Sequence, residues 1–221
     1  MNSFESVMNS PEQPKEVHPT DKNILHVCKK LKEGLFDFVI AGGYARDKYY
    51  GLLPKDCDIC VFNFHPEDAA EAALLEQFLN HMKHFTDVEV HGEYDGSDGR
   101  LGDVIKLPEW NIDIIFYRSA SCAFDVMTQF DCNLNQAFIL SSIPSKFYSP
   151  ELSNIRWLHG VPPKQLHFLT EDLSLARIEH MFLKWHLCTG LTAGSEAIEF
   201  RQRLAKKLQP FDDEAEMDTP W

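Results

Sequence analysis

The sequence predicts a mixed α/β fold, with one mixed β-sheet flanked by helices and a short helical extension at the C-terminal end. The expected order is helix, strand, short helix, strand, long helix and then three strands in succession. Strict alternation would favour a parallel sheet, and strands alone would favour a sandwich or a barrel. The observed order matches neither, and 44% apolar with 25% charged residues is typical of a globular core.

The first part of the chain contains a predicted helix and two predicted strands. Residues 20–34 (TDKNILHVCKKLKEG) combine a capping threonine, apolar residues at helical spacing and a final glycine. The runs 36–42 (FDFVIAG) and 56–64 (DCDICVFNF) have the apolar and β-branched content of short strands. A short helix is expected between them, over about 44–50.

A longer helix is expected to begin at Pro66, because proline is favoured in the first turn and an apolar stripe follows it. The stripe consists of Ala69, Ala70, Ala73, Leu74, Phe78 and Met82. Three strand-like segments come next, at 86–94 (TDVEVHGEY), 101–107 (LGDVIKL) and 111–117 (NIDIIFY).

Beyond Asp131 the pattern shifts towards helices. One is expected over 170–187, ended by Gly190, and another over 195–208. The prolines and polar or acidic residues at the two ends of the chain predict loosely ordered tails. The predicted organisation is a tail (1–19), a catalytic-type domain (20–164), a helical extension (165–209) and an acidic tail (210–221).

Charge and composition exclude several classes of protein. A net charge of -13 disfavours a general nucleic-acid coat, because phosphate backbones would be repelled. No apolar stretch approaches the roughly 20 residues of a spanning helix, and the first residues lack the pattern of a signal peptide. Six cysteines, mostly inside apolar runs, predict reduced thiols. We therefore expect a cytoplasmic protein without membrane association.

The most informative stretch is residues 39–62 (VIAGGYARDKYYGLLPKDCDICVF). Gly42 and Gly43 end a predicted strand and precede a helix, where small residues let backbone N–H groups approach a phosphate. A glycine pair after a strand is also common in tight turns. The pair alone therefore predicts a turn as readily as a phosphate site.

Asp56 and Asp58 are two residues apart on a predicted strand, so their side chains share one face. Two adjacent carboxylates repel each other unless they are solvated at a strand end or neutralised by a cation. Oxygen ligands of this kind suit Mg²⁺ with a bound triphosphate. A third acid, Asp113, lies in another strand-like run, and a cluster of three would hold two Mg²⁺ ions.

This stretch resembles a known signature. G-G-Y-A-R-D (42–47), G-L-L-P (51–54) and K-D-C-D-I (55–59) are similar to the head domain of tRNA nucleotidyltransferases and poly(A) polymerases, in the polymerase-beta type nucleotidyltransferase superfamily. The resemblance extends over about residues 36–184. Its further parts are the strand pair at 99–118, the segment FDCNLNQAF (130–138) and the helix EDLSLARIEHMF (171–182).

The resemblance implies Mg²⁺-dependent transfer of a nucleoside monophosphate from a nucleoside triphosphate to a hydroxyl. Asp56, Asp58 and Asp113 would be catalytic and would hold the metal ions. The nucleotide would be bound by Gly42, Gly43, Arg46, Lys55, Asp131, Asn135, Arg177 and Lys184. From the residues alone, Arg46 either contacts phosphate or pairs with Asp47. Arg177 and Lys184, seven apart on one helical face, either reach the nucleotide or form a solvated edge.

The acceptor is open at this level. An RNA 3′ end is favoured by the resemblance, and a protein side chain is favoured by the acidity of the chain; a third reading is a catalytically silent nucleotide-binding or inhibitory partner protein. Gln129 and Phe130 stand where the family has paired arginines, and few residues follow the head-like region. Nucleotidyl transfer is therefore implied more strongly than a tRNA substrate.

Two other motifs predict no site. Cys57-x-x-Cys60 has no second ligand pair, and strand alternation places its two sulfurs on opposite faces. His81 and His84 lack the glutamate of a zinc-binding H-E-x-x-H helix. We expect buried thiols and surface or capping histidines.

Overall fold

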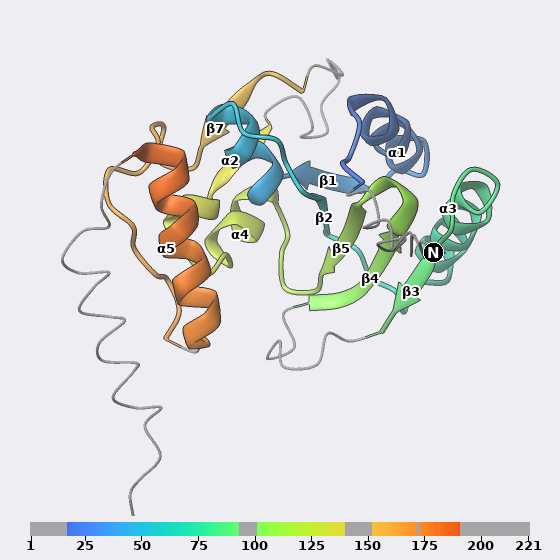
Figure 1. Ribbon diagram of the computed structural model, residues 1–221. Helices are drawn as coiled ribbons and strands as arrows, with labels where there is room; N and C mark the ends of the chain where they lie inside the picture. Colours follow the sequence, from blue (N-terminus) through green and yellow to red (C-terminus); the bar gives the residue numbers. More distant parts are fainter. Residues whose placement is uncertain (1–16, 93–100, 140–151, 172, 191–221) are drawn as a thin grey trace, which may run out of the picture.

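The computed structural model describes residues 17–92, 101–139, 152–171 and 173–190. Figure 1 shows helices packed around a central sheet. The helices are α1 (Asp21–Glu33), α2 (Gly43–Tyr49), α3 (Ala69–Met82), α4 (Ala123–Thr128) and α5 (Leu175–Thr189), with 3₁₀ turns η1 (Pro108–Trp110) and η2 (Asn133–Asn135). The strands are β1 (Asp37–Ile40), β2 (Cys57–Phe62), β3 (Glu89–His91), β4 (Leu101–Leu107), β5 (Ile112–Tyr117), β6 (Ala137–Ile139) and β7 (Ile155–Trp157).

In the described part of the chain, the main sheet has five strands in the order β1-β2-β5-β4-β3. Strands β2 and β5 are parallel, and the other neighbours are antiparallel. The sheet is therefore mixed, which confirms the predicted fold class. The parallel pairing places Asp58 directly opposite Asp113.

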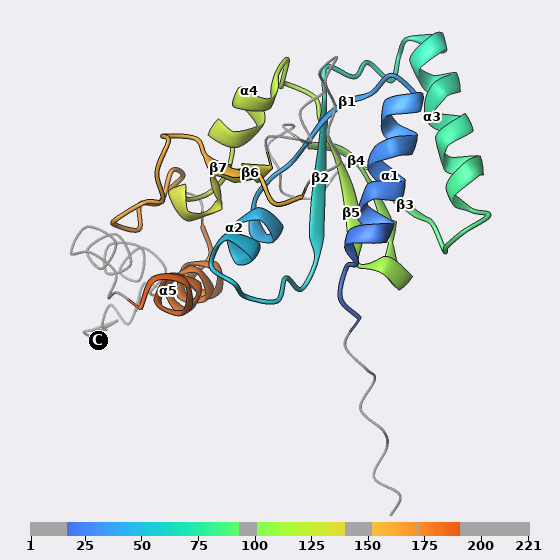
Figure 2. The same cartoon turned by 90° about the horizontal axis from the view of Figure 1, so that it is seen from above.

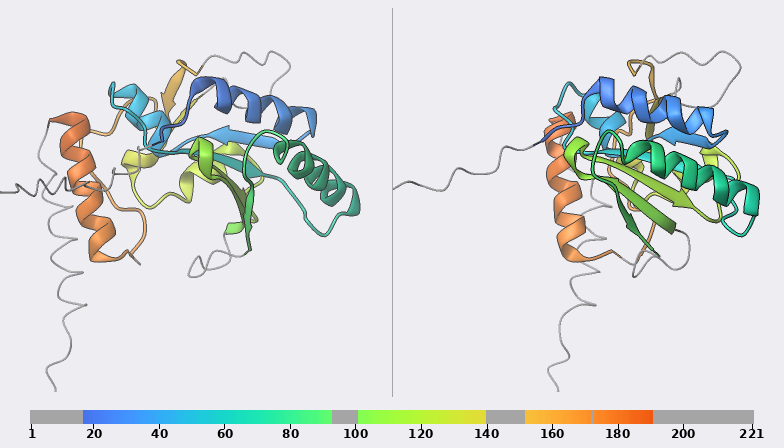
Figure 3. Two further views of the ribbon diagram at one scale, coloured as in Figure 1. Left: turned by 45° about the vertical axis from the view of Figure 1, so that its right-hand side comes forward. Right: turned by 90° about the vertical axis from the view of Figure 1, so that its right-hand side faces the viewer.

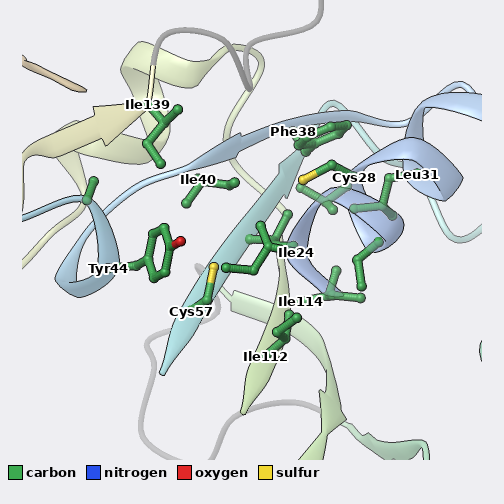
Figure 4. Close-up of a cluster of buried hydrophobic side chains, with 14 of the residues drawn as sticks. Ile24, Cys28, Leu31, Phe38, Ile40, Tyr44, Cys57, Ile112, Ile114 and Ile139 are labelled. Carbon is green, nitrogen blue, oxygen red and sulfur yellow. The ribbon is translucent and has the colours of Figure 1, made fainter. Parts of the chain in front are cut away.

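Each face of the sheet has its own covering. Figure 2 shows α1 and α3 together on one side of the sheet and α4 on the other. The α1 side contains the larger core, in which Ile24 and Leu31 of α1 pack with Ile59 of β2 and Ile114 of β5. Figure 4 shows this cluster between α1 and the strands, with Tyr44 of α2 and Ile139 of β6 at its edge.

The opposite face is covered only in part. A smaller core joins Val39, Cys60 and Phe62 of the sheet to Val126 and Met127 of α4. Asp58 and Asp113 lie on this face, because the residues next to them in β2 and β5 point into the larger core. Strand alternation thus places Asp58 and Asp113 on the less covered side of the sheet.

The C-terminal part adds a short hairpin and a helix. Strands β6 and β7 pair antiparallel, and the backbone N–H of Gly42 donates to the carbonyl of Ala137 at 2.9 Å. Helix α5 lies at the end of the molecule away from α1 and α3, as Figures 1 and 3 show. Its Met181 and Trp185 are buried.

Local sequence explains where the helices begin and end. The side chain of Thr20 accepts from the N–H of Asn23 to cap α1, and Asp68 caps α3 through the N–H groups of Ala70 and Glu71. Ser174 caps α5, and Gly190 ends it in the left-handed conformation with φ 64°. None of the helices in the described residues combines the length and the apolar character needed to cross a bilayer.

Several expectations differ from the structure. Helix α3 begins after Asp68 rather than at Pro66, and Ala69, Ala70 and Ala73 are exposed. Only the second half of that stripe is buried, because the N-terminal half of α3 extends beyond the sheet. Helix α5 begins at Leu175, since Ser174 rather than Thr170 supplies the cap.

The sequence analysis missed α4 and the β6–β7 hairpin, whose segments are too short to show a period. The helix expected over 195–208, the acidic tail, residues 1–16 and Arg100 lie outside the described residues. The sulfurs of Cys57 and Cys60 do belong to opposite cores, as alternation predicts.

Two imidazole rings pack between α1 and α3. His26 and His81 are stacked with centroids 5.7 Å apart and planes 20° apart, and His26 also contacts Phe85 and Trp110. Burial lowers the pKa of both histidines, and neighbouring positive charge from Lys30 lowers it further. The packing of these helices therefore favours neutral imidazoles.

This stack predicts a pH-dependent stability. A histidine whose pKa is lower in the folded than in the unfolded state keeps its full stability above about pH 6.5 and loses it as the pH falls. We expect His81→Gln to flatten the fall in melting temperature between pH 7 and pH 5, measured by thermal unfolding. His186→Gln, at an exposed position of α5, is the control. An unchanged slope in His81→Gln would contradict the argument.

Candidate functional site

The two glycines and the two aspartates form one small site. Gly42 has φ 82°, a conformation that residues with a Cβ rarely adopt. A Cβ added there would lie 3.8 Å from Oδ2 of Asp58, and one added at Gly43 would lie 3.9 Å from Oδ1 of Asp56. The space that the missing side chains leave is therefore bordered by both carboxylates.

Asp113 completes a cluster of three acids. It is the cross-strand partner of Asp58 on parallel β5 and is partly buried. Burial, followed by the charges of Asp56 and Asp113, raises the pKa of Asp58 to about 7, against opposing effects of Arg177 and Arg46. Burial also raises the pKa of Asp113, with Asp56 adding to it. Burial is the main cause of both shifts, and the neighbouring carboxylates add to it.

The cross-strand row extends beyond the acids. Lys106 of β4 is the partner of Asp113, and Glu89 of β3 is the partner of Lys106. Lys106 opposes the upward shift in the pKa of Asp113. The sequence analysis did not identify Lys106 as part of this row, because strand pairing between β4 and β5 decides its position.

The donor set fits a hard divalent cation whose shell is shared with a ligand. Carboxylate oxygens are preferred by Mg²⁺, and the raised pKa of Asp58 indicates that the acids lack a neutralising charge. Among the described residues, no group of three or more His, Cys, Asp or Glu side chains forms a ready metal site.

A chain of buried polar contacts begins beside the glycines. Arg46 is 5% exposed; its Nε donates to Oδ1 of Asp47 at 2.7 Å and its Nη1 donates to Oδ1 of Asn135 at 2.6 Å. Asn135 in turn donates through Nδ2 to Oδ1 of Asp131 at 2.8 Å. The structure therefore gives Arg46 the pairing with Asp47 that the sequence left as one of two readings.

Helix α5 supplies the residue at each end of this series of contacts. Nε of Arg177 donates to Oδ2 of Asp131 at 2.6 Å, and Nζ of Lys184 donates to Oδ2 of Asp47 at 3.0 Å. Burial of Asp131 opposes its ionisation, but the hydrogen bonds from Arg177 and Asn135 hold its pKa below its ordinary value. We call these six residues the polar chain: Lys184, Asp47, Arg46, Asn135, Asp131 and Arg177.

The structure thus brings ten of the eleven predicted site residues into two adjacent groups, the acid cluster with its glycines and the polar chain. The charges of Arg46 and Arg177 both lower the pKa of Asp58, which shows that the two groups are adjacent. Lys55 is exposed, next to Asp56 in the chain. Its side chain belongs to neither group.

Phe130 is a further site residue that the sequence did not predict. Phe130 stands where the family that this chain resembles has an arginine. Its Cζ would lie 3.9 Å from a Cβ added at Gly42. The site therefore presents an aromatic edge beside the glycines rather than a guanidinium. Asp47, too, is central to the polar chain although the sequence suggested it only as one partner of Arg46.

Comparisons with known proteins identify the fold. No protein-family model matches this sequence, and no curated protein matches it. A solved structure described as a tRNA-processing enzyme, apo form I, is similar with a TM-score of 0.53 at 14% identity, covering 89% of this chain and 48% of that one.

Two other similar structures are CCA-adding enzymes. That of Thermotoga maritima, complexed with tRNA, has a TM-score of 0.51 at 16% identity, over 87% of this chain and 44% of that one. A complex of a CCA-adding enzyme with CTP has a TM-score of 0.51 at 14% identity, with the same coverage of 87% and 44%. This chain therefore spans less than half of each of these proteins, and at these identities it shares their fold, that of a nucleotidyltransferase head domain.

The polar chain predicts a large effect of one buried acid. Asp47 is 3% exposed and accepts from two cations, so Asp47→Ala leaves Arg46 buried without its ion-pair partner. We expect a loss of about 3–5 kcal/mol in the free energy of unfolding. Chemical denaturation measures it. Glu33→Gln, in an exposed ion pair with Lys30, should leave stability almost unchanged. Equal small effects of both substitutions would contradict the structural role of the polar chain.

The raised pKa of Asp58 predicts a stability effect of opposite sign. Without a divalent cation, the folded state keeps a proton on Asp58 between about pH 4 and pH 7, so its contribution to stability is lost as the pH rises through 7. We expect Asp58→Asn to raise the melting temperature relative to wild type at pH 8 and to have little effect at pH 5, in EDTA.

Asp87→Asn, at an exposed position, serves as the control for that experiment. If the difference in melting temperature between Asp58→Asn and wild type is the same at both pH values, the carboxyl of Asp58 does not have a raised pKa.

Proposed function

We propose that the chain is a nucleotidyltransferase of the polymerase-beta type, which transfers a nucleoside monophosphate from a nucleoside triphosphate to a hydroxyl at an RNA 3′ end. The observation that carries this proposal is the placement of Gly42 and Gly43 beside Asp56 and Asp58, with Asp113 opposite Asp58. Space for phosphates next to clustered carboxylates is what metal-assisted phosphoryl transfer needs.

The glycines and acids have distinct roles in this proposal. The gap beside Gly42 and Gly43 accepts the β- and γ-phosphates without a side chain in the way. Asp56, Asp58 and Asp113 would hold Mg²⁺, which when bound neutralises phosphate charge and activates the attacking hydroxyl. The three acids also place the acceptor, since the hydroxyl must lie in line with the α-phosphorus.

The polar chain orients the remaining groups. Arg46 is buried and held by Asp47 and Asn135, so its role is to fix the glycine turn and to offset the charge of Asp58. Arg177 is 44% exposed while it pairs with Asp131, so it can contact a nucleotide without leaving that pair. Lys184 ties α5 to Asp47 and brings Arg177 to the site.

An RNA acceptor would be held weakly. Of the basic residues near the site, Lys48 pairs with Asp21, Arg177 with Asp131 and Lys184 with Asp47. Cations engaged in internal ion pairs release fewer counterions from a phosphate backbone. The complexes of CCA-adding enzymes with tRNA and with CTP support RNA and nucleotide as partners. We also propose a reducing compartment such as the cytoplasm, because the cysteines lie mostly inside apolar runs of the sequence.

The direct test is a labelling assay. The protein is incubated with each of four α-labelled nucleoside triphosphates, Mg²⁺ and a cell lysate, and label is read on RNA and on protein. We expect label on RNA 3′ ends, which Asp56→Ala and Asp58→Ala abolish while leaving the fold intact. Asp113→Asn should lower kcat more than it raises KM. Asp87→Ala is the matched control, because Asp87 lies outside the site.

The other outcomes discriminate between the alternatives. Label on protein with none on RNA would replace the RNA acceptor by a protein side chain. Triphosphate binding without any transfer would indicate a catalytically silent nucleotide-binding protein. Activity of Asp56→Ala and Asp58→Ala within tenfold of wild type would contradict the role of the acid cluster.

A further inference from the structure

A pocket lies beside η2, the turn that also contributes Asn135 to the polar chain. Its volume is about 450 Å³, within the range of small-molecule sites. One wall is Trp157 at the end of β7, and Val161, Pro162 and Pro163 add flat apolar surface. Asn133 of η2 and Gln136, which follows η2, line it, whereas Asn135 between them belongs to the polar chain.

Two pocket-lining side chains carry unpaired polar atoms. Oε1 of Gln136 and Nε1 of Trp157 are buried and have no hydrogen-bond partner in the described part of the structure. Gln136 and Trp157 are 4% and 5% exposed. A buried polar atom without a partner costs about 1–3 kcal/mol, so a ligand that supplied both partners would recover this energy.

The rest of the Trp157 environment fixes its position. Tyr49 and Tyr50 of α2 pack against its ring, with centroids 5.5 Å and 6.1 Å away. Nε2 of Gln136 donates to the carbonyl of Met127 at 3.1 Å, so its Oε1 is the end of the amide that stays unpaired. The Trp157 donor and the Gln136 acceptor are therefore each held in place by neighbouring residues.

The rim of the pocket carries one lysine in an otherwise acidic chain. Lys164 and His159 are exposed there, and His167 adds a third nitrogen-bearing side chain. Among the described residues that line the pocket, none is an Asp or a Glu. With a net charge of -13 over the whole chain, a rim of this kind favours an anionic ligand.

We propose that this pocket binds a nucleotide, with its base against Trp157 and its phosphate at Lys164. A nucleobase edge offers the acceptor and the donor that Trp157 Nε1–H and Gln136 Oε1 lack, and its flat face suits the apolar surface of Val161, Pro162 and Pro163. The base reaches the two covered atoms when the loop 158–165 shifts outward. The nucleotide comes either free or as part of a single-stranded RNA.

The pocket is separate from the acid cluster and does not depend on metal. The test therefore uses the full chain in EDTA, with each of the four nucleoside monophosphates and with a short single-stranded RNA of each base. Tryptophan fluorescence gives the affinity, and the Trp157 indole N–H resonance reports the new hydrogen bond.

We expect saturable binding of at least one probe with a shift of the Trp157 resonance. Trp157→Phe should weaken it about three- to tenfold through loss of one hydrogen bond. Lys164→Ala should weaken it about two- to fivefold. Trp110→Phe and Lys83→Ala are the matched controls, and Asp56→Asn should leave this binding unchanged, which separates it from the proposed transferase site.

The probes also distinguish the two sources. RNA that binds at least tenfold more tightly than its monophosphate identifies a nucleotide within a strand, and equal affinities identify a free nucleotide. Absence of saturable binding of every probe at millimolar concentration would overturn the proposal. Binding that is unchanged in both Trp157→Phe and Lys164→Ala would overturn it as well, and the surface position of Lys164 keeps the test valid if the Trp157 variant fails to fold.

Discussion

Burial of Asp58 beside the carboxylates of Asp56 and Asp113 is the constraint on which the arrangement of this site depends. Parallel pairing of β2 and β5 places the two carboxylates opposite each other, and Asp56 adds a third charge. Like charges directly opposite on neighbouring strands destabilise a sheet. The fold tolerates them because Arg46 and Arg177 oppose the shift at Asp58, and because the space beside Gly42 leaves room for a neutralising ligand. The acid cluster therefore costs stability, and this cost supports the proposal that the cluster binds a cation.

The polar chain makes α5 part of the site rather than an appendage. Its contacts join residues far apart in sequence: Arg46 to Asn135, Asp131 to Arg177 and Asp47 to Lys184. A buried ion pair contributes little net stability, but breaking it is costly. Displacement of α5 would leave Asp131 without its cation and Asp47 with Arg46 alone, close to the charge that Arg177 offsets at Asp58. Order in α5 and order in the site are therefore coupled.

The sequence was sufficient to predict features set by neighbouring residues, such as strands. It was not sufficient to predict contacts between residues that are far apart in the chain. Alternation in β2 and β5 was sufficient to predict two strands with Asp58 and Asp113 on them, and strand pairing then placed Asp113 beside Asp58. Asp56, predicted on the same strand as Asp58, lies just before β2 and is exposed. The partner of Arg46 could not be chosen from sequence, because Asn135 is 89 residues away. Burial of Ala73 was predicted from helical spacing and is wrong, since spacing says nothing about where a sheet ends. Roles in binding and catalysis stay predictions for every site residue.

Titration of the protein with Mn²⁺ at pH 8, followed by the electron paramagnetic resonance signal of the free ion, tests the central claim most directly. If the three carboxylates form a cation site, wild-type protein removes the free-ion signal saturably, more strongly when a non-hydrolysable nucleoside triphosphate is present, and Asp58→Asn loses most of this binding. Binding that is equally strong in Asp58→Asn, or no binding by the wild type even with the triphosphate, would contradict the account.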